Sequence, residues 1–148
     1  MRIPAALIIS VLIIASVSCV FIPVPTIERP AKAYPHYSEE LLDLINQYRT
    51  NNGLSVLYYD DKLTAIAEGH STDMYRRNVL SHDHFHERFN QSGSDYCVEN
   101  VGWNYPTPGD EFNAWRNSEE HNRNMLAGDI RKAGISRVGA YVTFFACN

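Results

Sequence analysis

The spacing of apolar residues first predicts two amphipathic helices. Behind Ser38, apolar residues recur at helical spacing after an acidic first turn, until Gly53 interrupts the pattern. A serine before an acidic turn and a glycine after the last apolar residue are typical of the two ends of a helix. A second apolar stripe follows the aspartates at 60–61 and runs to Met74, with His70 on its apolar side. We therefore expect His70 to lie in the core or behind a site, and not to be a metal ligand.

Further along the chain, the pattern predicts a loop and then more helices. Residues 78–95 show no clean period and contain three closely spaced histidines, so we expect a long loop there. Thr107 stands before a proline and an aspartate at the first and third helical positions, which predicts a third helix. Residues 119–126 are predicted to be helical as well, with Ser118 available to cap a separate short piece.

Strand signals occupy the remaining stretches. Residues 97–103 are typical of a strand, and a second, β-rich run returns from a turn near Gly139 to form a hairpin within residues 130–146. Helices beside a small, largely antiparallel sheet define an α+β domain.

The N-terminus has the pattern of a targeting segment. Arg2 precedes a nearly continuous apolar stretch, residues 3–24, and a Pro-rich linker follows it. A basic residue before an apolar segment is the signature of secretion, and about 20 apolar residues also suffice to span a bilayer. We expect residues 1–33 to be a signal peptide or an N-terminal membrane anchor plus linker, with membrane contact through this segment alone. The folded domain is then 34–148, outside the cytoplasm, either secreted or anchored by residues 3–24.

In an exported domain, the cysteines are expected to form a disulfide. Cys19 lies in the targeting segment, which leaves Cys97 and Cys147 as an even pair in an oxidising compartment. We expect a disulfide between them that ties the C-terminal strand to the sheet. The alternative is that Cys97 is a nucleophile beside a histidine.

Length and charge exclude several classes of protein. A chain of 148 residues accommodates one domain, and its net charge of −4 comes without a basic stripe. Nucleic-acid binding is therefore not expected, because it depends on basic residues that neutralise phosphates. Neither common Gly-rich phosphate loop is present, so we expect no nucleotide and no organic cofactor.

The candidates for chemistry are two histidines and three glutamates from separate segments: His82, Glu99, Glu119, Glu120 and His121. Imidazole nitrogen and carboxylate oxygen are ligands that Zn²⁺ prefers. The chain matches no zinc motif, so two interpretations stay open. One is a divalent metal site, and the other is a solvated histidine-rich loop with an outward-facing glutamate. No motif for a nucleophilic serine is present either.

Four short motifs follow one another within residues 38–148, and a fifth comes after them: Ile45-Asn46-x-Tyr48-Arg49, Leu80-Ser81-His82, Glu99-Asn100-Val101-Gly102, Trp115-x-x-Ser118-x-x-His121-x-x-Asn124-Met125-Leu126 and Ala133-Gly134-Ile135. In this order they resemble the CAP superfamily (cysteine-rich secretory proteins, antigen 5 and pathogenesis-related proteins), also called SCP domains, and in particular its short prokaryotic-type members. The resemblance implies a three-layer α-β-α sandwich with a central antiparallel sheet. It also implies a groove on one face that holds two histidines and two glutamates.

The resemblance assigns three groove positions and leaves the fourth open. His82 and His121 match histidines of the family, and Glu99 matches the glutamate of its Glu-Asn motif. Ser118 stands where long-form members have a glutamate, so Glu119 is the nearest acidic substitute, and the glutamate after it is equally close in sequence. The sterol-binding loop of eukaryotic members has no counterpart here, so sterol binding is not expected.

Three functions are compatible with such a groove. We expect a secreted binding or interaction module, rather than an enzyme, whose groove holds Zn²⁺ or another divalent cation between His82, His121 and Glu99. One alternative is a zinc-dependent hydrolase of peptides or esters, with Glu119 or Glu120 as general base. The other is a non-catalytic structural or adhesion domain of the cell surface. The ligand class stays open among a protein, a lipid and a small molecule, and we expect a monomer.

Overall fold

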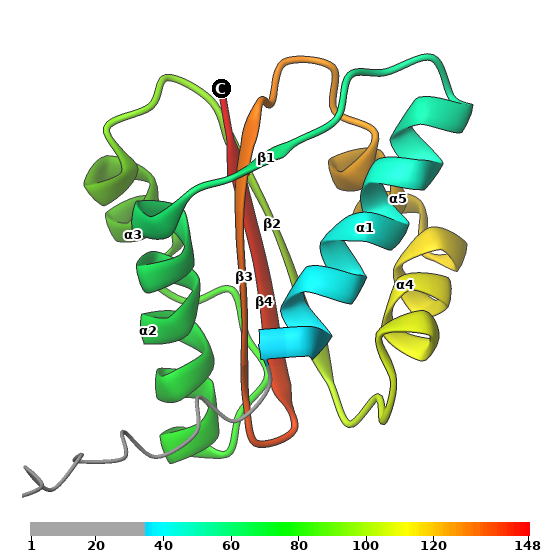
Figure 1. Ribbon diagram of the computed structural model, residues 1–148. Helices are drawn as coiled ribbons and strands as arrows, with labels where there is room; N and C mark the ends of the chain where they lie inside the picture. Colours follow the sequence, from blue (N-terminus) through cyan, green and yellow to red (C-terminus); the bar gives the residue numbers. More distant parts are fainter. Residues whose placement is uncertain (1–34) are drawn as a thin grey trace, which may run out of the picture.

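A four-stranded sheet lies between two layers of helices (Figure 1) in the computed structural model, which describes residues 35–148. The strands follow the order β1-β3-β4-β2 across the sheet. Helices α2 and α3 cover one face, and α1, α4 and α5 cover the other, so the predicted α-β-α sandwich is confirmed. The elements are α1 (Pro35–Asn51), β1 (Tyr58–Tyr59), α2 (Asp61–Arg77), α3 (Phe85–Ser92), β2 (Cys97–Trp103), α4 (Pro108–Asn117), α5 (Glu119–Met125), β3 (Lys132–Val138) and β4 (Tyr141–Cys147).

Two predicted helix starts are confirmed by their caps. Asp60 Oδ1 accepts a hydrogen bond from the Leu63 amide at 2.9 Å, which places the start of α2 at the predicted aspartates. Thr107 Oγ1 accepts in the same way from the Asp110 amide at 3.1 Å, at the start of α4. Ser118 separates α4 from α5, as the sequence indicated.

Two stretches differ from the prediction. Helix α1 begins at Pro35, so Ser38 lies inside the helix and not at its start. A proline fits the first helical turn because the N–H that it lacks would have no partner there. Residues 78–95, predicted as a loop, contain α3. The buried side of α3 carries Arg88 and Ser92, two polar residues, so no hydrophobic period marks it as a helix.

The sheet is antiparallel apart from one short strand. β4 pairs with β2 on one side and with β3 on the other, both in antiparallel register. The turn between β3 and β4 contains Gly139 at φ +59°, where a side chain would also collide with the Tyr75 ring. β1 consists of Tyr58 and Tyr59, pairs with β3 in parallel, and was not predicted. Two residues are too few to produce a strand pattern.

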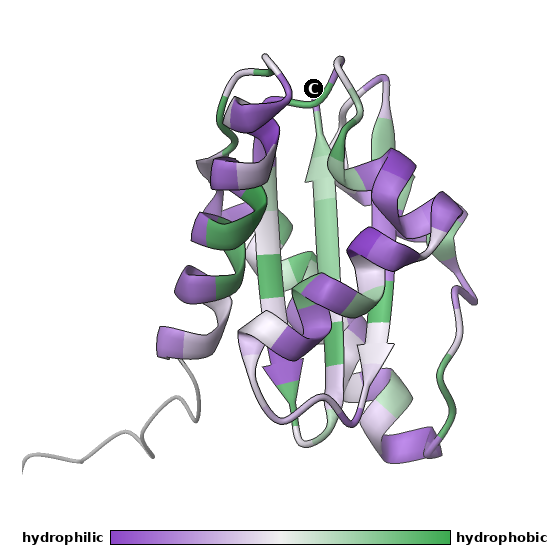
Figure 2. Ribbon diagram, turned by 90° about the vertical axis from the view of Figure 1, so that its right-hand side faces the viewer, coloured by the Kyte–Doolittle hydropathy of each residue, from purple (hydrophilic) through white to green (hydrophobic). Residues whose placement is uncertain are grey.

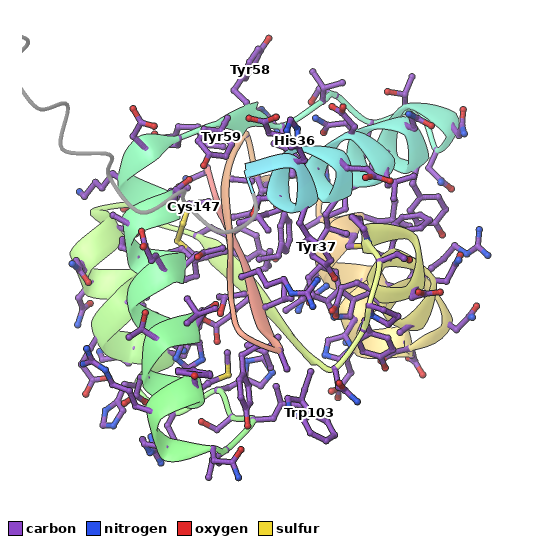
Figure 3. All side chains as sticks on the ribbon, turned by 60° about the horizontal axis from the view of Figure 1, so that its bottom comes forward. His36, Tyr37, Tyr58, Tyr59, Trp103 and Cys147 are labelled. Atoms are coloured by element: carbon purple, nitrogen blue, oxygen red, sulfur yellow. A yellow bond between two sulfur atoms is a disulfide. The ribbon has the colours of Figure 1, made fainter. Side chains whose placement is uncertain are left out.

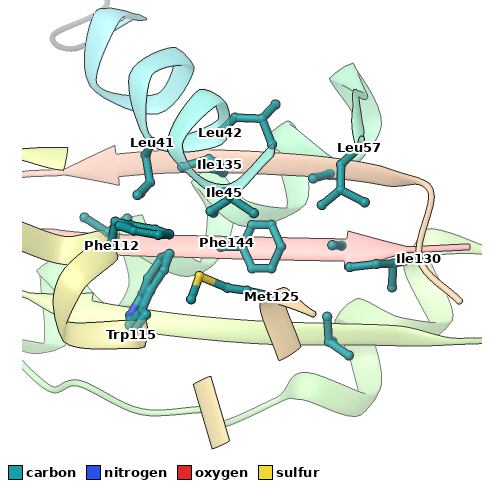
Figure 4. Close-up of a cluster of buried hydrophobic side chains, with 14 of the residues drawn as sticks. Leu41, Leu42, Ile45, Leu57, Phe112, Trp115, Met125, Ile130, Ile135 and Phe144 are labelled. Atoms are coloured by element: carbon teal, nitrogen blue, oxygen red, sulfur yellow. The ribbon is translucent and has the colours of Figure 1, made fainter. Parts of the chain in front are cut away.

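The larger hydrophobic core fills the space between the sheet and helices α1, α4 and α5 (Figure 4). Ile45 of α1, Trp115 of α4 and Phe144 of β4 all belong to this cluster and are almost wholly buried. A smaller cluster around Phe145 lies between α2 and the opposite face. Figure 2 shows the same division, with hydrophobic residues concentrated on the strands and hydrophilic residues on the outer surfaces of the helices.

Gly134 lets helix α2 lie directly on the sheet. A Cβ atom at this position of β3 would collide with the backbone of Leu63 and Thr64. Because no side chain separates the two backbones, α2 is held at a fixed height above the sheet. His70 follows about two turns later on the same helix, and its position over β2 depends on this contact.

None of the helices within residues 35–148 combines the length and the hydropathy that a membrane span requires. The predicted targeting segment, residues 1–33, lies outside the described residues. Cleavage of the leader and its retention as an anchor therefore both stay predictions.

A disulfide joins Cys97, the first residue of β2, to Cys147, the last residue of β4 (Figure 3). The two cysteines are register partners on adjacent strands and are 50 positions apart in sequence. The predicted pairing is confirmed. Since its sulfur is part of the bridge, Cys97 is not a free nucleophile.

Removing the bridge should lower the stability of the domain. Replacing both Cys97 and Cys147 with alanine opens a 50-residue loop, and the chain-entropy model puts the loss in free energy of unfolding at about 4 kcal/mol. Urea denaturation of the purified wild type and variant measures this change. Reduced wild-type protein should match the variant, and equal stability of the oxidised wild type and the variant would contradict the role assigned to the bridge.

Candidate functional site

The candidate site is built around Glu99, a buried carboxylate on the end strand β2. Its side chain is 1% exposed and faces residues of α2 and α3. Arg88 of α3 contacts both carboxylate oxygens, because Nε donates to Oε2 and Nη2 donates to Oε1, each at 2.7 Å. His82 Nδ1 lies 2.9 Å from Oε1. The carboxylate therefore has partners from two separate segments.

These partners determine the charge of Glu99. Burial alone would raise the pKa of this carboxyl, but the hydrogen bonds from His82 and Arg88 outweigh burial and hold the pKa below its ordinary value. Glu99 is thus ionised at neutral pH and forms a buried ion pair with Arg88, whose side chain is 9% exposed. Two parallel charge-assisted bonds of this length make a strong and directional contact.

The same contacts fix the imidazole of His82. An ionised carboxylate can only accept, so His82 Nδ1–H donates to Glu99, and Nε2 of the neutral ring is left as an acceptor. The His82 side chain is 51% exposed. The backbone next to it is held as well, because Arg88 Nη1 donates to the Asp83 carbonyl oxygen at 2.7 Å. His82 therefore presents Nε2 to solvent in a fixed orientation.

His70 lies behind the site, as predicted. It is 4% exposed, and its Nε2–H donates to the Ser81 carbonyl oxygen at 2.8 Å. The same nitrogen lies 3.7 Å from Glu99 Oε1. Burial lowers the pKa of His70 in spite of the nearby carboxylate. A neutral His70 thus holds the backbone immediately before His82.

Two asparagines join β2 to α5 and place His121. Asn100 Nδ2 donates to the His121 carbonyl oxygen at 3.0 Å. Asn124 Nδ2 donates to the Glu99 carbonyl oxygen at 3.0 Å and to Asn100 Oδ1 at 2.9 Å. Because β2 is an end strand, its outward carbonyl groups would otherwise lack partners within the sheet. These bonds connect the Glu-Asn motif to the helix that carries His121.

The imidazole of His121 lies in the same neighbourhood as that of His82. Burial lowers the pKa of His121, and the nearby His82 lowers it further when the His82 ring is protonated. On its other side, the His121 ring packs 6.3 Å from the ring of Trp115. Trp115 is itself fixed, since its Nε1–H donates to the Val101 carbonyl oxygen at 3.2 Å. His82 and His121 thus influence each other electrostatically, and of the two it is His82 that contacts the Glu99 carboxylate.

The two glutamates considered for the fourth site position are exposed residues of α5. Glu119 Oε1 accepts a hydrogen bond from Arg123 Nη2 at 2.9 Å, and its side chain is 89% exposed. Because Glu119 pairs with Arg123, it is not part of the hydrogen-bond network around Glu99. The negative charge of Glu120, by contrast, acts to raise the pKa of His121. Of the two, Glu120 is the acidic neighbour of the site.

The donor set does not fit a metal ion held by His82, Glu99 and His121 together. Both oxygens of Glu99 have hydrogen-bond donors, and one of the donors is a guanidinium cation. Within residues 35–148, no group of three or more His, Cys, Asp or Glu side chains is arranged to hold a metal ion. The nitrogens that remain are Nε2 of His82 and the ring of His121, and Zn²⁺ binding there stays a prediction.

Arg88 is the site residue that was not predicted. It lies in the segment without a hydrophobic period, where no helix was expected. A signal was nevertheless present, because a buried glutamate needs a partner of opposite charge. Arg88 is the only lysine or arginine between His82 and Glu99 in sequence. Together with His70, it also lines an open cavity of about 200 Å³ between α2 and α3.

A second buried carboxyl lies on the opposite face of the sheet. Glu111 of α4 is 0% exposed and lies against Gly102 of β2, where any side chain would collide with its carboxyl group. The Tyr37 hydroxyl donates to Oε2 at 3.5 Å, and Oε1 has no hydrogen-bond partner. Burial raises the pKa of Glu111 to about 8, against the lowering effects of Tyr37 and Arg137. Glu111 is therefore mostly protonated at pH 7, unlike Glu99.

Comparisons with known proteins agree with this architecture. The model of the cysteine-rich secretory protein family (CAP) matches residues 42–148. YlbC, an uncharacterized membrane protein of Bacillus subtilis, is 31% identical over 117 residues, which make up 71% of this chain and 32% of that protein. The chain spans between about a third and two fifths of the length of the curated relatives it matches.

Solved structures show the same fold. An extracellular protein of Bacillus anthracis that contains an SCP domain superposes with a TM-score of 0.72 at 24% identity, over 76% of this chain and 40% of that one. An outer surface protein of Borrelia burgdorferi superposes with a TM-score of 0.69 at 19% identity, over 74% of this chain and 90% of that one.

The buried carboxyl of Glu111 should make the stability of the protein fall as pH rises. Its pKa in the fold, about 8, exceeds the ordinary value of 4.5, so the folded protein keeps a proton that the unfolded chain loses between these values. Glu111→Gln should therefore be more stable than wild type at pH 8, by on the order of 4 kcal/mol, and about equally stable near pH 4. Urea denaturation at the two pH values measures the difference.

Glu68→Gln is the matched control for this experiment. Glu68 is exposed on α2, so the variant should keep the pH dependence of the wild type. If Glu111→Gln also kept that pH dependence, Glu111 would not hold the proton assigned to it.

Proposed function

The chain belongs to the cysteine-rich secretory protein (CAP) family, and from this premise we propose that it is a binding module that acts outside the cytoplasm, secreted or at the cell surface. Its ligand contacts the His82 imidazole, with His121 beside it. One observation carries the proposal. A buried and ionised Glu99 fixes Nδ1 of His82, while half of the His82 side chain is exposed to solvent.

Three observations support the location. The domain contains a disulfide between Cys97 and Cys147, and such bonds form and persist in oxidising compartments. The apolar stretch 3–24 has the pattern of an export signal. The proteins that resemble this chain include an extracellular protein, an outer surface protein and a membrane protein.

The contacts of the two imidazoles favour binding over covalent hydrolysis. Across the described part of the chain, no hydroxyl or thiol group hydrogen-bonds to the ring of His82 or His121. Neither ring therefore has a nucleophile to activate. Glu119, considered as a general base, pairs with Arg123 at the surface, away from the buried carboxylate. A base would have to reach the proton that it removes.

The orientation of His82 also indicates which ligand groups fit. Its Nδ1–H is directed to Glu99, so a ligand that meets Nε2 of the neutral ring must supply the donor. Hydroxyl groups and amide N–H groups meet this condition. Peptides and polyhydroxylated small molecules both carry such groups, and they are the ligand classes that the site suits.

A fragment screen followed by protein-observed NMR tests the proposal. Fragments with hydroxyl or amide donors should shift the signals of His82 and His121 and their neighbours, and His82→Ala should weaken the binding of these fragments about tenfold or more because the oriented acceptor is lost. His86→Ala is the matched control, since His86 is an exposed histidine of the same segment. Fragments that bind elsewhere, or that bind His82→Ala as well as wild type, would contradict the proposed site.

A further inference from the structure

Arg88 occupies the space beside Glu99 that a metal ligand site would leave for an ion. Its Nε and Nη2 contact the two carboxylate oxygens at 2.7 Å, and its Nη1 donates to the Asp83 carbonyl oxygen at 2.7 Å. All three guanidinium nitrogens thus have partners, and the side chain is 9% exposed. The cation is part of the fold, held between α3 and the segment that carries His82.

A divalent ion at Glu99 would either have to displace this guanidinium or share the carboxylate with it. Oε1 already accepts from both His82 and Arg88, and Oε2 accepts from Arg88. Displacement would leave Arg88 buried without its counter-charge, and an ion that stayed beside it would be repelled. Both outcomes are unfavourable, so Glu99 is a poor ligand in the presence of Arg88.

We propose that Arg88 is the resident cation of this site and excludes divalent metal ions from Glu99. The carboxylate then serves to orient His82, and the buried pair has no net charge. Ligands recognised through hydroxyl or amide donors are compatible with this arrangement, whereas a metal coordinated by Glu99 is not. The inference rests on the proposed function only for the location of the site.

Cobalt(II) titration of metal-free protein, followed by visible absorbance, tests the exclusion. Arg88→Gln should raise the Co²⁺ affinity of the protein about tenfold or more, because it frees the carboxylate, and the gain should vanish in the double variant Arg88→Gln/Glu99→Gln. Arg123→Gln is the matched control: it removes the same charge from the exposed pair with Glu119 and should leave the affinity unchanged.

Two results would overturn the proposal. One is a double variant Arg88→Gln/Glu99→Gln that keeps the gain in Co²⁺ affinity of Arg88→Gln, which would show that the freed carboxylate is not the ligand. The other is an Arg88→Gln protein that folds and shows no gain in affinity.

If Arg88→Gln does not fold, a measurement on the wild type tests whether Arg88 excludes metal ions from Glu99. The NMR signal of the Arg88 Nε–H group should keep its position in excess Zn²⁺, because the guanidinium stays on Glu99, and a shifted or lost signal would overturn the proposal. Fragment binding to His82 is measured without metal. Failure of the metal exclusion and failure of the proposed function are therefore distinguishable.

Discussion

The buried charge of Glu99 is the constraint on which one half of the structure depends. An ionised carboxylate is tolerated away from water only when it is paired and hydrogen-bonded, and here the partner is Arg88. This requirement helps to account for α3, a short helix whose buried side carries a guanidinium beside Phe85, which packs on the ring of Phe145. It also accounts for the path of the preceding segment, which is bound through His82 and the Asp83 carbonyl oxygen. One charge thus organises two segments that have little apolar surface of their own.

Three residues of the family motifs hold α5 in place through buried or partly buried hydrogen bonds. Asn100 and Asn124 connect the strand to the helix through their side-chain amides. Arg49, from the first motif, is buried and donates to the carbonyl oxygens of Met125 and Ala127 at 2.7 and 2.9 Å. A cation at the C-terminal end of a helix is favourable, because the last carbonyl groups have no partners within the helix. The helix of the site histidine is therefore fixed by the asparagines on one side and by Arg49 at its end.

The sequence predicts the helices and strands that bury an apolar stripe and that begin at a local cap. It does not predict the elements whose position depends on polar contacts between distant residues. Helices α2 and α4 begin at Asp60 and Thr107 because those side chains bind amides a few residues away, a local contact. The contact between Arg88 and Glu99 is tertiary, and no local pattern records it. The fourth site position stays a prediction. Consecutive helical residues point in different directions, and Glu119, one position after the expected glutamate, pairs with Arg123 at the surface.

The two buried carboxyls show how the environment, and not the residue type, sets the charge of this domain. Glu99 has a guanidinium 2.7 Å away and keeps its negative charge, whereas Glu111 has only the Tyr37 hydroxyl at 3.5 Å and keeps its proton. Both arrangements leave the interior around β2 without net charge, although the whole chain carries −4. A molecule that approaches His82 is consequently not attracted by an uncompensated carboxylate below it. Recognition at this position then depends on the direction in which the imidazole accepts a hydrogen bond, and that direction is fixed by the same ion pair that cancels the charge.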